Sequence, residues 1–172
     1  MKNRMFGRIK EPLEGFRRLL VVLAICLWFG GFTFYSLVVI HTGHRVFESR
    51  VEVGFLTQAV THWLNLIGIG ALLLMLWNLF VGWSTQGRWA RGIMVTTWLL
   101  AAGIEVVLFM LHPRMDVLMD SDAQKILSFP EFKRLHLIYI NYSTVQWSAT
   151  ILYIWACVCA WRSMDRQELS QK

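Results

Sequence analysis

Long apolar stretches alternate with short polar segments along the chain, and four of the apolar stretches are long enough to cross a lipid bilayer. A transmembrane helix needs about 20 apolar residues to cross roughly 30 Å of hydrocarbon. Because lipid offers the backbone no hydrogen bonds, stretches of this kind are expected to be helical. The predicted spans are about 19–41, 55–83, 92–112 and 136–161.

These spans predict an all-α fold, an integral membrane antiparallel four-helix bundle. The composition agrees, because 16% of the residues are charged and a soluble domain usually carries about 25%. The expected organisation is a basic N-terminal tail at 1–18, a transmembrane domain at 19–161 with an outer loop at 113–135, and a C-terminal tail at 162–172. In that loop we expect a short helix around Asp122 to Leu127, with Ser121 as its N-cap.

The basic residues are distributed unevenly between the two ends of the bundle. The two tails and the loop between the second and third spans hold eleven of the 17 Lys and Arg residues, and the other loops hold most of the acids. Since cytoplasmic loops carry an excess of Lys and Arg, we expect both termini in the cytoplasm and the protein in the bacterial inner membrane. The net charge is +6, and the basic residues flank the spans. The lipid bilayer is therefore the expected partner and nucleic acid is not.

Polar residues recur at spacings of three and four in every span, which places them on one helix face. Polar groups are costly in lipid and usually face the interior, so four such stripes predict a bundle with a polar interior. The stripes are Cys26, Gly30, Thr33, Leu37, His41 and His44; Gln58, His62 and Asn65; Thr97, Ala101, Glu105, Leu108 and His112; and His136, Tyr139, Ser143, Gln146, Thr150, Tyr153 and Cys157.

The histidines lie at or near the outer side, and each span contributes at least one. Imidazole is a good ligand for haem iron, copper and zinc. His62 and His136 are the preferred axial pair for haem b, because they come from different spans. Tyr139 and Glu105 are expected to support this cofactor site.

A transition-metal site is the related possibility, with His41, His44 and His112 as its candidate ligands. His41 and His44 have the i, i+3 spacing that lets two imidazoles reach one ion. The competing interpretation is that histidines at span ends simply sit in the hydrated headgroup region, and that His62 bonds to a neighbouring helix. Glu105 is harder to explain structurally, since an unpaired carboxylate in lipid needs a partner or a water path.

Other motifs argue against several classes of function. The chain contains no Walker A, HExxH, GxSxG or GxGxxG pattern, which argues against an energy-coupled pump or a soluble-type hydrolase. Cys26, Cys157 and Cys159 lie inside apolar stretches, where a disulfide framework is not expected. No catalytic residue is therefore assigned from the sequence.

Two stretches resemble a known membrane family. They are Trp28–Tyr35 (WFGGFTFY), which leads through Val38-Val39-Ile40 to Phe47, and Phe132-Lys133-Arg134-Leu135-His136 at the start of the last span. Together they resemble the four-span family that includes transmembrane protein 205 and its bacterial relatives of unknown function. The resemblance implies four spans and no established chemistry, and His136 is where it coincides with a polar stripe.

The sequence leaves three hypotheses open. In the first, a histidine-containing site in the extracytoplasmic half binds haem b or a transition metal and transfers electrons or serves a quinone. In the second, the chain is an accessory or scaffold subunit that packs against other membrane subunits without a cofactor of its own. In the third, it is a small proton- or cation-linked transport protein that uses Glu105 as the carrier.

Overall fold

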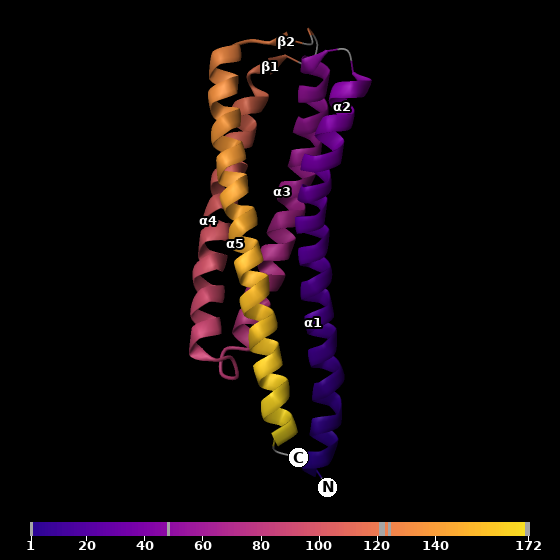
Figure 1. Cartoon of the computed structure of the whole chain (residues 1–172), viewed down its shortest axis with the longest axis vertical. Helices are drawn as coiled ribbons and strands as arrows, with labels where there is room; N and C mark the ends of the chain where they lie inside the picture. Colours follow the sequence, from indigo (N-terminus) through magenta and orange to yellow (C-terminus); the bar gives the residue numbers. More distant parts are fainter. Residues whose placement is uncertain (1, 48, 121–122, 124, 171–172) are drawn as a thin grey trace.

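The computed structural model describes residues 2–47, 49–120, 123 and 125–170, most of them in long helices that lie side by side (Figure 1). The helices are α1 (Lys2–Phe34), α2 (Ile40–Val46), α3 (Arg50–Val81), α4 (Arg88–Asp116) and α5 (Phe129–Ser170). A π-helical turn, Tyr35–Val39, joins α1 to α2, so that these segments form one continuous rod. The all-α fold is confirmed for the described residues.

Four of the described helical rods are long and apolar enough to cross a membrane, as the sequence predicts. The helices run past the predicted span ends, because α1 already includes most of the N-terminal tail and α5 continues into the C-terminal tail. The segment between α4 and α5 contains two short antiparallel strands, β1 (Met119–Asp120) and β2 (Lys125–Ile126). The helix expected there is therefore wrong at 123 and 125–127, and its positions at 121–122 and 124 lie outside the described residues.

Local capping chemistry sets the ends of α3. The Ser49 side chain accepts a hydrogen bond from the Val51 amide at 3.1 Å, which satisfies one of the free N–H groups in the first turn. At the other end the Gly82 amide donates to the Asn78 carbonyl. The short turn that follows leads directly into α4 and keeps the two helices antiparallel.

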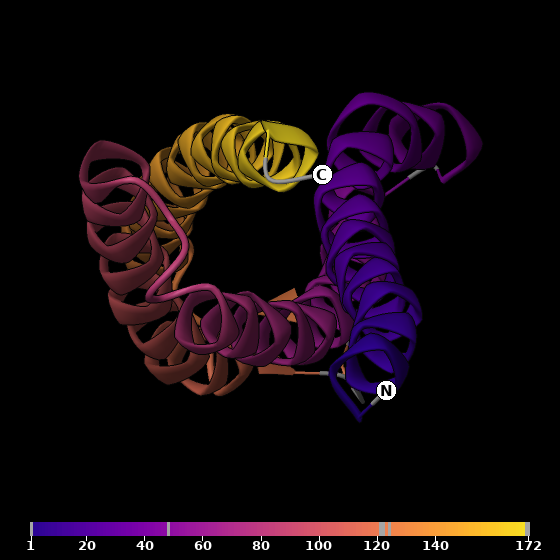
Figure 2. The ribbon, with the colours of Figure 1, turned by 90° about the horizontal axis from the view of Figure 1, so that it is seen from below.

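The rods follow the order α1, α3, α4, α5 around the bundle (Figure 2). Each packs along its neighbour in this series, but among the described residues α1 and α5 meet at only a few points. Small residues on α5, including Ala149, Ala156 and Ala160, are almost fully buried, and they let adjacent helices approach closely. The apolar core around Met75 and Tyr153 lies toward the end of the bundle that holds the chain termini.

The seam between α1 and α5 is closed at two heights. Midway, the Trp147 ring stacks on Phe29 with centroids 4.8 Å apart, and the Trp147 indole donates to Thr33 Oγ1 at 3.2 Å. Near the termini, Arg18 forms an ion pair with Asp165 at 2.8 Å. Above Trp147 no such contact closes the seam among the described residues, and this opening determines the shape of the site described below.

A buried polar network centred on Asn78 ties three helices together near the termini. The Asn78 side chain is fully buried and accepts a hydrogen bond from the Arg17 guanidinium of α1. Its amide donates to Tyr153 Oη at 3.3 Å and to Cys157 Sγ at 3.4 Å, both on α5. The Tyr153 hydroxyl in turn donates to the Met75 carbonyl at 2.8 Å. Every helix in the network therefore has a buried polar partner on another helix.

The polar stripes of the third and fourth spans are confirmed as interior faces. Glu105 on α4 and Gln146 on α5 are 4% and 5% exposed, and the other members of these two stripes are buried or half-buried. The second stripe is mixed, because Asn65 is buried and Gln58 half-buried whereas His62 is exposed.

The stripe predicted for the first span is wrong. Cys26, Leu37 and His41 are exposed, and the buried face of this rod instead carries Val21, Ile25, Trp28 and Tyr35, large apolar or aromatic side chains. A π-turn adds a residue to one helical turn, which rotates the following face by about 100°. The mismatch begins before this turn, at the exposed residues Cys26 and Gly30, because the buried face of the rod is apolar and no polar residue marks it.

Candidate functional site

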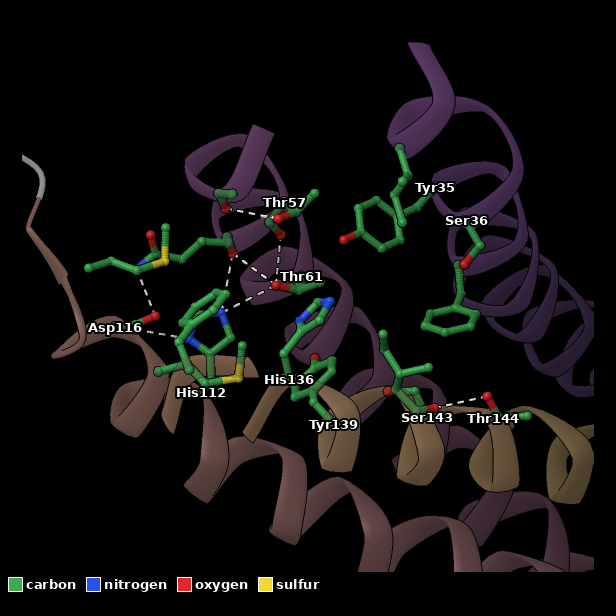
Figure 3. Close-up of a pocket in the computed structure, with 18 residues that line it drawn as sticks. Tyr35, Ser36, Thr57, Thr61, His112, Asp116, His136, Tyr139, Ser143 and Thr144 are labelled. Carbon is green, nitrogen blue, oxygen red and sulfur yellow. Dashed lines mark hydrogen bonds and ion pairs between the residues drawn. The ribbon is translucent and has the colours of Figure 1, made fainter. Parts of the chain in front are cut away.

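A cavity of about 330 Å³ lies in the half of the bundle farther from the termini, between the α1–α2 rod, α3, the end of α4 and the beginning of α5 (Figure 3). Its wall includes Ile140 and Thr144, which are exposed on α5, and half-buried Ser36 and Ile40 on the rod opposite. The cavity therefore reaches the molecular surface in the open seam between α1 and α5. Its volume is at the lower end of the range of small-molecule sites.

The π-turn supplies one wall of the cavity. Tyr35 and Ser36 are its first two residues, and both line the cavity. In Figure 3 the Tyr35 hydroxyl points into the same space as the His136 ring, which comes from α5. π-Bulges within α-helices are frequent at functional sites, where they redirect side chains.

A polar network closes the end of the cavity nearest the interhelical loops. His112 Nδ1 lies 2.9 Å from Asp116 Oδ2, one turn along α4, and His112 Nε2 lies 3.2 Å from the Gln58 carbonyl of α3. The Gln58 amide also donates to Asp116 Oδ1 at 2.6 Å. Both ring nitrogens of His112 thus face acceptors, and in this arrangement neither is free to bind a metal ion.

His136 is differently placed, because its ring nitrogens have no hydrogen-bond partner among the described residues. Its ring stacks on Phe132, one turn earlier on α5, with centroids 5.9 Å apart and planes 8° from parallel. Tyr139, the next cavity residue along α5, donates its hydroxyl to Asn65 Oδ1 of α3 at 2.9 Å. The His136 imidazole is therefore available to a molecule in the cavity, whereas the Tyr139 hydroxyl is already engaged.

The structure brings together some of the predicted site residues and separates others. His112, His136 and Tyr139 line the cavity, but His62 does not, and its exposed ring contacts the His112 ring from outside with centroids 5.7 Å apart. Glu105 is buried deeper in the bundle and is absent from the cavity wall.

The remaining two candidate ligands are also apart from this site. His41 and His44 are exposed on α2 and do not line the cavity. In the part of the chain that the structure describes, no three or more His, Cys, Asp or Glu side chains are grouped so that they could hold one metal ion.

Sequence reasoning missed two residues of the site, Tyr35 and Asp116. Tyr35 lies in an apolar stretch and off the expected stripe. It follows Trp28 by two helical turns and therefore lies on the same buried face. Asp116 was expected in the outer loop, yet it belongs to the last turn of α4 and binds His112 there. Its i, i+4 spacing from His112 was the available signal.

Comparisons with protein-family models, curated proteins and solved structures found no match to this chain. The resemblance to the family of transmembrane protein 205 therefore stays a prediction.

Proposed function

We propose that this chain is an integral membrane protein with four spans and both termini in the cytoplasm. The four long apolar helices support the spans. The orientation rests on the excess of basic residues in the tails and in the loop between α3 and α4. The cavity then lies in the extracytoplasmic half of the bilayer, and its opening between α1 and α5 faces lipid.

The topology can be tested with cysteines introduced into a cysteine-free variant. Lys125→Cys lies between α4 and α5, and Ser84→Cys lies between α3 and α4; both residues are exposed. A membrane-impermeant maleimide added to intact cells should label the cysteine at 125 and spare the one at 84 until the membrane is permeabilised. The opposite labelling pattern would overturn the proposed orientation.

We further propose that the cavity binds an amphipathic ring compound of the quinone class, which enters from the outer leaflet. The observation that carries this proposal is the unpartnered His136 imidazole opposite the Tyr35 hydroxyl in a cavity open to the seam. A quinone has two carbonyl acceptors on opposite sides of an apolar ring, and the ring carries an apolar tail. Hydrogen-bond donors on opposite walls of the cavity can bind the two carbonyls, and Phe32 and Met115 can pack against the ring. The apolar tail of the quinone can reach lipid through the seam.

The test measures binding of a short-chain benzoquinone to the protein in nanodiscs. Quenching of tryptophan fluorescence reports the binding. His136→Leu and Tyr35→Phe should each weaken binding about 3- to 10-fold, the loss expected for one hydrogen bond of about 0.5–1.5 kcal/mol. His62→Leu is the matched control, because His62 is on the same half of the bundle but outside the cavity. Equal affinity in wild type and His136→Leu would contradict the proposal.

An absorption spectrum of the same preparation separates this proposal from the haem hypothesis. A Soret band that is lost in His136→Leu would show that the free imidazole binds haem iron instead of a quinone carbonyl. If neither a Soret band nor quinone binding is found, the scaffold hypothesis gains support.

A further inference from the structure

Glu105 is buried in the middle of α4, and one side chain forms a hydrogen bond with its carboxyl group. It is 4% exposed, and Gln146 Nε2 of α5 donates to its Oε2 at 2.7 Å. The same Gln146 nitrogen also donates to the Ala101 carbonyl at 3.1 Å, which holds the amide across the α4–α5 interface. No ion pair to Glu105 occurs among the described residues, so no lysine or arginine neutralises the carboxylate.

The second carboxyl oxygen, Oε1, is buried without a hydrogen-bond partner among the described residues. Oε1 therefore lacks a hydrogen bond in either protonation state of the carboxyl group. An ionised carboxylate needs a donor at Oε1, and a carboxylic acid protonated at Oε1 needs an acceptor there. Water is the simplest group that meets both needs, because it can donate or accept.

Water does not reach Glu105 from the lipid side. A groove of about 320 Å³ between α3 and α4 borders this residue, and its other walls include Leu72, Trp98 and Val106. The groove presents only apolar surface, and in a bilayer it would be filled by acyl chains. Any hydration of the carboxyl group must therefore come from inside the bundle.

The inside route begins at Ser143. Its Oγ is a second buried atom without a partner among the described residues, and the residue is 3% exposed. Ser143 lines the large outer cavity and also a small one of about 20 Å³, whose walls include Gln146 and Thr150. One water molecule needs roughly 10–15 Å³ of such space and two to four polar partners, so the small cavity has room for a water between Ser143 and the partner of Glu105.

We propose that Ser143 and a water in the small cavity form a path from the outer cavity to Glu105, and that Glu105 exchanges a proton with the extracytoplasmic side along this path. The path begins at Ser143, and Gln146, which lines the small cavity, joins it to the Glu105 carboxyl group. The apolar groove closes the alternative route, and the Gln146 amide holds the carboxyl group in place. This inference does not depend on which ligand the outer cavity binds.

The other titratable groups around Glu105 in the described residues are tyrosines and histidines, so Glu105 is the carboxylic acid of this region. On α5 the nearest buried ones above and below are Tyr139 and Tyr153, since Tyr142 is exposed, and on α4 the nearest is His112, seven residues away or about 10 Å. On the first rod Tyr35 lies two helical turns above Trp28, which packs near Glu105 at Gly68. On α3, His62 faces outward.

Infrared difference spectroscopy of the reconstituted protein tests the path directly. A protonated carboxyl group gives a carbonyl stretching band that shifts when its proton is replaced by deuterium. We expect such a band in wild type, absent in Glu105→Gln, with a rapid shift after transfer to D₂O. Ser143→Val removes the hydroxyl and fills the small cavity, so the shift should slow at least tenfold.

Two further variants keep the result interpretable. Ser148→Val makes the same change on the exposed face of α5 and should exchange like wild type. Ser143→Cys, which is close to serine in size but a weak hydrogen-bonding group, should slow exchange in the same direction if Ser143→Val does not fold. A band that persists in Glu105→Gln, or an unchanged exchange rate in the folded Ser143 variants, would overturn the proposal.

Discussion

Replacing Asn78 with leucine should destabilise the bundle more than most single substitutions. Leucine has a similar volume, so the change removes hydrogen bonds without opening a large cavity. It deletes the acceptor of the Arg17 guanidinium and the donor to Tyr153 and Cys157 in a fully buried site. The cost follows from what each partner loses.

The Arg17 contact dominates this cost, because a hydrogen bond to a charged group contributes about 1.5–3 kcal/mol. Arg17 keeps its ion pair with Glu14 at 3.3 Å, which limits the loss. The bond to Tyr153 adds about 0.6 kcal/mol, the average for interhelical bonds in membranes. The free energy of unfolding should therefore fall by about 2–3 kcal/mol, measured by SDS titration of the protein in mixed micelles.

A double variant sharpens this test. Arg17→Met combined with Asn78→Leu replaces both partners with apolar groups and leaves no unpaired buried charge. It should be more stable than Asn78→Leu alone, which is a clear departure from additivity. Asn141→Leu on the exposed face of α5 is the control and should change stability by about 0.5 kcal/mol or less. Strictly additive losses in the double variant would refute the reasoning.

Two further variants test packing and surface charge. Gly68→Ala should cost about 1–3 kcal/mol, because its Cβ would lie 2.7 Å from the Trp28 indole nitrogen. Gly70→Ala, whose Cβ would meet nothing within 4 Å, should be neutral or slightly stabilising in the same SDS titration. Arg18→Gln removes the partly exposed ion pair to Asp165 and should cost about 0–1 kcal/mol at low salt. The difference from wild type should shrink as salt is added to the unfolding buffer.

Hydropathy predicted the number and helical nature of the rods, because both depend on composition over about 20 residues. The stripes on α4 and α5 were also predictable. No π-turn interrupts either helix, so one period holds, and their polar side chains, such as Glu105 and Gln146, bond across a helix interface. Such residues have no equally good partner on their own helix, so the interior is their only favourable location.

The first rod could not be predicted in the same way, for two physical reasons. The buried face of this rod carries apolar and aromatic side chains such as Trp28 and Tyr35, so no polar stripe marks it. The π-turn then begins at Tyr35 and changes the register of the residues that follow, including Ser36 and Ile40 of the cavity wall. No sequence pattern marks such a turn, so the part of the cavity wall that this rod forms could not be predicted.

For the transmembrane arrangement proposed above, the length of the first rod also has a consequence in the bilayer. Arg18 and Arg45 bracket its apolar portion and are 27 positions apart, which corresponds to about 40 Å along a helix. This distance exceeds a hydrocarbon layer of roughly 30 Å and leaves both guanidinium groups at headgroup level in a bilayer of ordinary thickness. In a thinner bilayer the rod would have to tilt. Because Arg18 holds α5 through Asp165, a tilt of the first rod would pull on the neighbouring helix, so the width of the lipid-facing opening should vary with lipid chain length.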